Sequence, residues 1–178
     1  MLERLHLDHR NMRTLLDLIA TKLDKIAAEE PVKLWVILDA IEYLHTYSDH
    51  CHHPMEDILY QLYLDKNPFP EINILAEQHK KLATQTQQLL VTLKQIMADI
   101  IVERKVLVQQ LEAFITSQLQ HLKNEEEHIF PLLKKHFSDN DWQRAKQQSL
   151  TLMKTDPLFT VNQDNEFNDL RKHLAQVA

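Results

Sequence analysis

Hydrophobic residues recur in steps of three and four along most of the chain, which is the spacing of one face of an α-helix. The pattern predicts four long helices, over residues 2–29, 32–64, 71–98 and from residue 104 to about 137. The turns between them are expected at Pro31, at Asn67–Pro70 and at Asp99–Glu103. Long amphipathic helices joined by short turns predict an all-α fold, an antiparallel up-down four-helix bundle.

Two additional C-terminal helices are expected after the bundle. Ser138 and Asp141 have the spacing of a capping box and begin a short helix that Asp156-Pro157 is expected to end. A last helix, over residues 163–176, carries hydrophobic residues on one face. The residues of that face are Phe167, Leu170, Leu174 and Val177.

The chain therefore divides into two parts, a bundle over residues 1–137 and a C-terminal helical extension over residues 138–178. The extension either packs on the bundle or lies at an oligomer interface, for instance that of a homodimer. The sequence leaves both arrangements open.

The composition narrows the classes of function. The chain has 178 residues and no glycine, which excludes the glycine-dependent phosphate loops of P-loop and Rossmann nucleotide-binding proteins. A net charge of −6 weighs against nucleic acid and anionic membranes as partners. No apolar run is long enough to cross a bilayer, the N-terminus does not resemble a signal peptide, and Cys51 has no second cysteine to pair with. We therefore expect a cytoplasmic protein.

Polar residues interrupt the apolar faces of all four predicted helices. They are His9, His52, Glu56, His79, His121 and Glu125. Two residues at equal distances from the turn of an antiparallel helical hairpin lie at the same height. His9 and His52 meet this condition at the first turn, Glu56 and His79 at the second, and His79 and His121 at the third. All four helices therefore bring a buried polar group to one layer, where each needs a partner because burying it alone is unfavourable.

The spacing within this layer indicates metal binding. His52 and Glu56 are four residues apart, as are His121 and Glu125, so each pair lies on one helix face. Four histidines and two carboxylates are too many ligands for one tetrahedral zinc ion. They suit two ions of higher coordination number that share the carboxylates, and mixed imidazole and carboxylate ligation favours iron, with manganese or zinc as substitutes.

These residues resemble the hemerythrin-like, HHE cation-binding family. The matching pieces are Leu7-Asp-His9, His52-His-Pro-Met-Glu56, Glu77-Gln-His79, His121-Leu-Lys-Asn-Glu125 and Ile129-Phe-Pro-Leu132, and the resemblance spans about residues 5–137. It implies a non-haem di-iron site with an oxo or hydroxo bridge, in which the four histidines are terminal ligands and the two glutamates are bridges. It also implies binding or sensing of a small molecule, such as O₂, NO or peroxide, or of iron or redox state.

One departure from the family pattern concerns the third helix. Many members carry a second histidine there, four residues from the first, and this chain has Ala83 instead. His53 is the first candidate to replace it, because Pro54 distorts the helix locally and can turn His53 inward. His128, one turn after Glu125, is the second candidate. The third possibility is a water molecule, which would favour reactive chemistry over reversible binding.

Several residues near the predicted layer are expected to have roles other than direct metal binding. Tyr47 and Tyr43 lie about one and two turns before His52, and either could hydrogen-bond near the metal ions. Cys51 is expected to be a neutral thiol that faces away from the layer. Glu126 and Glu127 are expected to be solvated.

Three classes of function are compatible with the sequence. The first is a protein that binds or senses a small molecule at two irons. The second is a di-iron enzyme with peroxidase-like or iron-donating repair activity, which the missing third-helix histidine favours. The third is a regulatory interaction module in which the metal only stabilises the bundle.

Overall fold

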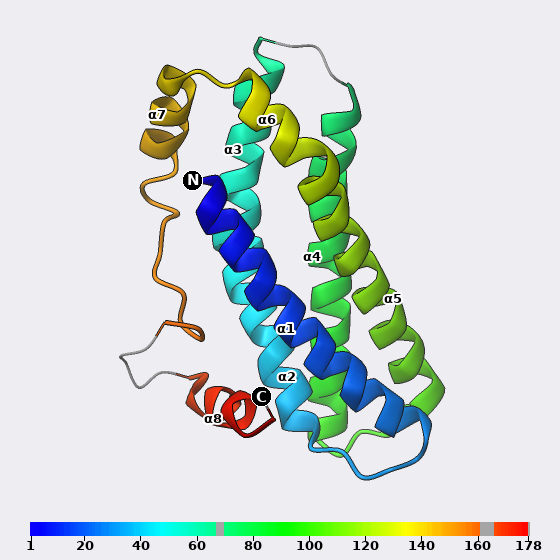
Figure 1. The fold of residues 1–178 in the computed structure, drawn as a ribbon. Helices are drawn as coiled ribbons and strands as arrows, with labels where there is room; N and C mark the ends of the chain where they lie inside the picture. The colour runs from blue at the N-terminus through cyan, green and yellow to red at the C-terminus, as the bar shows by residue number, and fades with distance from the viewer. Residues whose placement is uncertain (67–69, 161–165, 178) are drawn as a thin grey trace.

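The computed structural model describes residues 1–66, 70–160 and 166–177, apart from the side chains of residues 70–74, 76 and 177. Within these ranges the chain forms helices and no strand, which confirms the all-α prediction. The helices are α1 (Leu2–Ala27), α2 (Leu34–Tyr43), α3 (His53–Leu64), α4 (Pro70–Met97), α5 (Arg104–Asn124), α6 (Phe130–His136), α7 (Asp139–Gln148) and α8 (Asn168–Val177). Two π-helical segments, η1 (Leu44–His52) and η2 (Glu125–Ile129), join α2 to α3 and α5 to α6. The result is four long helical stretches that lie side by side (Figure 1).

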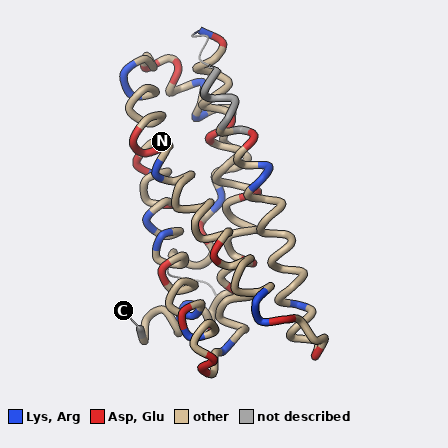
Figure 2. The backbone as a smooth tube through the Cα atoms, turned by 90° about the vertical axis from the view of Figure 1, so that its right-hand side faces the viewer, with Lys and Arg blue, Asp and Glu red and all other residues tan. Residues whose placement is uncertain are grey.

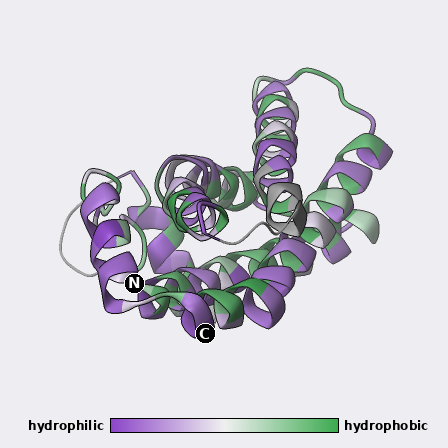
Figure 3. Cartoon of the chain, turned by 90° about the horizontal axis from the view of Figure 1, so that it is seen from above, coloured by the Kyte–Doolittle hydropathy of each residue, from purple (hydrophilic) through white to green (hydrophobic). Residues whose placement is uncertain are grey.

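Two apolar clusters stabilise this arrangement, with a polar layer between them. The first cluster includes Met12, Ile37, Leu89 and Leu111, and the second includes Leu5, Leu59, Leu75 and Leu133. The predicted polar layer falls between them on every long stretch, as His9 does between Leu5 and Met12. Seen from above, each helix carries hydrophobic and hydrophilic residues on different sides, as an amphipathic helix should (Figure 3).

Two of the turns end a helix without glycine. The backbone of Glu29 has φ 63° and that of Asp99 has φ 58°, the left-handed conformation in which glycine is usually found. In both turns the N–H groups that follow the helix return to its last carbonyls, from Glu30 to Lys25 and from Ile100 to Gln95. The expected Asp99–Glu103 turn is therefore confirmed, whereas most of the expected Asn67–Pro70 turn lies outside the described residues.

Each π-helical segment lies immediately before a proline. η1 ends one residue before His53-Pro54, and η2 ends one residue before Phe130-Pro131. A proline inside a helix lacks the N–H group and clashes with the carbonyl four residues earlier, and a wider π turn accommodates both effects. The expected distortion at Pro54 is confirmed.

The C-terminal helices pack on the rest of the chain, α7 against α3 and α8 against α2. Ser138 and Asp141 form the predicted capping box at the start of α7. The predicted end of this helix at Asp156-Pro157 is wrong, because α7 ends at Gln148. Phe167 and Leu170 join the first apolar cluster, whereas the predicted start of the last helix lies outside the described residues. The division into two parts at residue 137 stays a prediction.

The surface carries charges of both signs. In the view of Figure 2, Lys and Arg are interspersed with Asp and Glu along the helices. Among the described residues, no helix combines the length and the apolarity needed to span a bilayer.

Candidate metal centre

Five buried histidines from four helical stretches meet at the polar layer. His9 lies on α1, His52 at the end of η1, His53 at the start of α3, His79 on α4 and His121 on α5. They form two groups with Glu56. In the two-histidine group, ligand atoms of His9, His52 and Glu56 lie within 4.8 Å of one another, and in the three-histidine group the same holds for His53, His79, His121 and Glu56. The single predicted layer is therefore present and is divided into two neighbouring groups.

Glu56 and Glu125 connect the two groups. Oε1 of Glu56 lies 3.1 Å from His52 Nε2 and 3.4 Å from His9 Nε2, and its Oε2 lies 3.6 Å from His79 Nε2. Oε2 of Glu125 lies 3.5 Å from His9 Nε2, and its Oε1 lies 3.2 Å from His121 Nε2 and 3.5 Å from His79 Nε2. Each carboxylate therefore offers one oxygen to each group, which is the arrangement of a bridging ligand.

The π-helical segment explains how two successive histidines both reach the layer. Neighbouring residues of a regular α-helix point about 100° apart, so one of them normally faces away. The wider turn of η1 before Pro54 changes this direction, and His53 is only 3 % exposed. Its ring stacks on that of His79, with centroids 4.3 Å apart and planes at 12°. His53 thus lies in the three-histidine group, where the sequence pattern lacks a histidine at Ala83.

The far ring nitrogen of every histidine in the two groups has an acceptor. Nδ1–H of His9 donates to Glu126, that of His52 to Asp8, that of His79 to Asp57 and that of His121 to Gln78, over 2.9–3.2 Å. Nδ1 of His53 lies 3.4 Å from Asp49. Such contacts fix the tautomer and turn the lone pair of Nε2 toward the interior, as partners of metal-bound histidines do.

Several atoms that face the layer lack a hydrogen-bond partner in the described part of the chain. They are Nε2 of His53, His79 and His121, both carboxylate oxygens of Glu56, and Oε2 of Glu125. Burial of such groups without partners is unfavourable by roughly 1–3 kcal/mol each. The carboxylate oxygens of Glu56 and Glu125 lie 3.1–3.6 Å from Nε2 atoms of His9, His52, His79 and His121. These distances also fit ligands around one ion, because bonds of about 2.1 Å place neighbouring ligands roughly 3.0–3.5 Å apart. The residues therefore fit metal ions.

In the absence of metal, protons compensate the buried carboxylates. Burial alone would lower the pKa of His52, but Glu56 and Asp8 outweigh this effect and raise it to about 10. The pKa of His79 is also raised to about 10, because Asp57 and Glu125 outweigh burial. Burial would raise the pKa of Glu56, but His52 and His9 hold it well below the usual range. The layer therefore favours positive charge, which metal ions supply more strongly than protons.

The other candidates from the sequence lie outside the two groups. His128 is exposed, and its Nδ1 contacts the Asn124 carbonyl oxygen. Tyr47 donates to Asp8 and so contacts the partner of His52, whereas Tyr43 donates to Asp156. Cys51 is buried in the first apolar cluster, where burial raises the pKa of its thiol.

The interpretation of Glu126 as a solvated residue is wrong. Its carboxylate accepts from His9 Nδ1 and from Arg13, and both hold its pKa down at about 2. η2 begins at Glu125, and its wider turn changes the direction of the residue that follows.

Sequence reasoning also missed the outer partners Asp8, Asp49, Asp57 and Gln78, and Tyr60, which donates to Glu125. Asp8 and Gln78 directly precede a histidine of the layer, and Asp49 lies four residues before His53. These short distances in sequence from a histidine of the layer were the signal that could have identified Asp8, Gln78 and Asp49 as its partners.

An all-helical chain whose core holds histidines and shared carboxylates defines a class, the helical non-haem metal-binding proteins. Within this class the chain belongs to the hemerythrin family, because the model of the hemerythrin HHE cation binding domain matches residues 1–133. The match ends within α6, so α7 and α8 lie beyond it. No curated protein matches the chain. Membership of this family implies cation binding, which the two groups of ligand atoms can provide.

Proposed function

We propose that this chain is a di-iron protein that binds or senses a small molecule such as O₂, NO or peroxide. Its long helices would form an antiparallel up-down four-helix bundle around the irons. His9 and His52 would hold one iron, and His53, His79 and His121 the other. Glu56 and Glu125 would bridge them.

The observation that carries this proposal is that both carboxylates extend one oxygen toward each histidine group. Five histidines and two carboxylates exceed the ligands that one ion takes, and they are suitable for two. Nitrogen and oxygen donors without a thiolate favour iron, with manganese or zinc as substitutes.

The chain's own residues would tune the site. Glu126 orients His9, Asp8 orients His52 and Asp57 orients His79, each through the Nδ1–H group of the histidine, which strengthens these histidines as ligands. The apolar clusters on both sides of the layer limit access of water. Iron, when bound, would supply reversible coordination of the small molecule and a change of oxidation state.

The second class, a di-iron enzyme, was favoured by a vacant position at Ala83. This argument loses its basis because the imidazole of His53 lies in the three-histidine group. We therefore favour binding or sensing over an enzyme. The chain's partners would be small ligands rather than nucleic acid or membranes.

The test is metal analysis of protein expressed with ample iron, together with absorption spectra of the aerobic and the dithionite-reduced protein. About two irons per chain and visible absorption bands that disappear on reduction are expected. Glu56→Gln should abolish these bands. The matched control is Glu42→Gln, which removes a half-exposed carboxylate that pairs with Lys94, and it should retain them. Less than one iron per wild-type chain, with no such bands, would contradict the proposal.

A further inference from the structure

The part of the chain that follows α7 has no regular helix, yet it is held firmly in place. Residues 150–159, here called the C-terminal segment, run beside α1 (Figure 1). Asp156 is the anchor of this segment, because it is buried and accepts hydrogen bonds from Tyr43 and Asn11 over 2.9 and 3.1 Å. Its second oxygen accepts from two backbone N–H groups of its own segment. One carboxylate therefore ties the C-terminal segment to both α1 and α2.

A second contact connects the C-terminal segment to the candidate metal centre. The backbone carbonyl oxygen of Lys154 accepts from the guanidinium of Arg4 over 2.9 Å. Nε–H of Arg4 donates to Oδ1 of Asp8 over 3.0 Å, and Oδ2 of Asp8 accepts from Nδ1–H of His52 over 3.2 Å. Tyr47 accepts from Arg4 and donates to Oδ1 of Asp8. A continuous chain of hydrogen bonds therefore joins the C-terminal segment to a histidine of the two-histidine group.

Arg4 fixes the orientation of the Asp8 carboxylate within this chain of hydrogen bonds. Asp8 is only 1 % exposed, so its charge depends on donors from the protein. Because Arg4 and Tyr47 hold Oδ1, the other oxygen is directed at His52. Arg4 reaches Lys154 at the same time because a guanidinium has five N–H donors in one rigid plane. A lysine side chain, with a single nitrogen, would lack this geometry.

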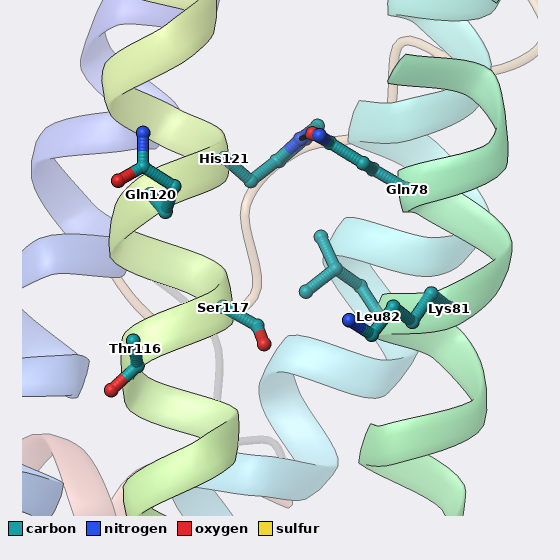
Figure 4. A pocket seen from close by; sticks show the side chains of 7 residues that line it. All are labelled: Gln78, Lys81, Leu82, Thr116, Ser117, Gln120 and His121. Carbon is teal, nitrogen blue, oxygen red and sulfur yellow. Dashed lines mark hydrogen bonds between the residues drawn. The ribbon is translucent and has the colours of Figure 1, made fainter. Parts of the chain in front are cut away.

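Among the described residues, His52 is the one histidine of the two groups whose outer partner leads on to the C-terminal segment. The partner of His79 is Asp57, which is half-exposed. The partner of His121 is Gln78, and Figure 4 shows these two side chains pointing toward one another beside the cavity between α4 and α5. The C-terminal segment also lies beyond the part of the chain that matches the hemerythrin family. The connection through Arg4 is thus a feature of the C-terminal extension rather than of the matched domain.

We propose that Arg4 is a positioning residue of the two-histidine group, and that it couples docking of the C-terminal segment to metal binding. His52 keeps the orientation that Asp8 and Arg4 require when its Nε2 is bound to metal, which favours the docked segment. The docked segment in turn holds Arg4 and keeps His52 oriented for metal. Since such coupling is reciprocal, docking and metal binding strengthen each other by the same factor.

The consequence is a signal at the surface of the protein. Loss of metal loosens the C-terminal segment, in which Leu150 and Lys154 are exposed, so the state of a buried site becomes accessible from outside. The inference rests on the proposed function, since it requires metal at the two-histidine group.

The coupling is tested by hydrogen–deuterium exchange and mass spectrometry of the protein with and without saturating zinc. Zinc should slow exchange of the backbone amides of residues 150–159 by about 5–10-fold more than that of α7, which packs on α3. Arg4→Lys keeps the positive charge beside Asp8 but breaks the connection, so zinc should then slow the segment no more than α7. Arg10→Lys, the same substitution at an exposed residue of α1, is the control and should behave as the wild type.

The reciprocal effect is tested by calorimetric titration with zinc. Asp156→Ala removes the anchor of the segment and should weaken zinc binding by the same factor of about 5–10. In the Arg4→Lys background, Asp156→Ala should change the Kd for zinc by less than about twofold, because the connection is already broken. The control is Asp169→Ala, which removes an exposed carboxylate that pairs with Lys172 on α8, and it should leave the Kd unchanged.

Proton NMR of the zinc-loaded protein measures the effect at His52 itself. Its Nδ1–H signal is identified as the imidazole signal that changes most in Asp8→Asn. Exchange of this proton with water should be about 5–10-fold faster in Asp156→Ala than in the wild type, whereas the imidazole signals of the other histidines should keep their rates. A general loss of stability would not single out one imidazole proton.

The outcomes distinguish the two proposals. Wild-type protein that takes up no zinc would overturn the proposed function itself. If the wild type binds zinc but exchange of residues 150–159 is slowed no more than that of α7, the segment is not coupled to the site. If Arg4→Lys retains the selective slowing, or if its effect on zinc affinity adds to that of Asp156→Ala, Arg4 is not the connection. Circular dichroism melts identify a variant that fails to fold, and Tyr43→Phe, which removes one donor to Asp156, then replaces Asp156→Ala.

Discussion

Replacing His53 by alanine is the sharpest test of the proposed metal centre, because we propose that this residue substitutes for the histidine that Ala83 does not supply. In the metal-free protein two effects oppose each other. The variant loses a buried ring stacked on His79, which is unfavourable by about 2–5 kcal/mol for a large-to-small change. It also removes a buried Nε2 without a partner, which is favourable by roughly 1–3 kcal/mol. The metal-free stability should therefore fall only modestly.

The metal-dependent part of the stability should change more. Partners of metal ligands contribute about 10–100-fold to affinity, and a direct ligand should contribute at least the upper value. A 100-fold weaker Kd at fixed metal concentration reduces the stabilisation by about 2.7 kcal/mol. For a chain of this size that corresponds to a loss of about 5–11 °C in the metal-induced shift of Tm.

The assay is a pair of thermal melts, with and without a fixed concentration of zinc, supported by calorimetric titration of the stoichiometry. His128→Ala is the matched control, because it removes an exposed histidine of the same size outside both groups. It should retain the full zinc-induced shift. A zinc-induced shift of His53→Ala equal to that of the wild type would refute the role of His53.

Three further predictions follow from the same structure. Asp8→Asn should weaken metal binding about 10–100-fold in a metal titration, because an amide supports His52 less than a carboxylate does. Asp17→Asn, on the exposed side of α1, is the control and should leave the metal affinity unchanged. Zinc binding near pH 7 should release about one proton or more per ion, because His52 and His79 have pKa values of about 10 without metal, and the zinc affinity should therefore rise with pH. Proton release is measured by calorimetry in buffers of different ionisation enthalpy. A binding enthalpy that does not depend on the buffer would contradict the prediction. Glu29→Gly should raise the free energy of unfolding, measured by urea denaturation, by about 0.5–1 kcal/mol, because glycine adopts the left-handed backbone at φ 63° without steric strain. A decrease would show that the backbone of Glu29 is not strained.

The sequence determined the helices and the height of the site. Apolar periodicity predicted the four long stretches, and prolines marked the turns at Pro31 and at Asn67–Pro70. Equal distances from the turns placed His9, His52, His79 and His121 in one layer, because an antiparallel hairpin converts sequence separation into height. The capping box at Ser138 was also predictable, since it depends only on local spacing. The end of α7 was not, because no local signal stops the helix at Gln148.

The direction of each side chain was decided by the tertiary structure. A regular helix with 3.6 residues per turn would turn His53 away from His52, and Glu126 away from Glu125. The π-helical segments before Pro54 and Pro131 change these directions by an amount that periodicity does not contain. The outer partners depend on contacts between helices far apart in sequence, such as Asp8 with His52 and Gln78 with His121. The sequence by itself therefore determined which residue types reach the layer, and only the packed helices decided which nitrogen faces the metal and which acceptor supports it.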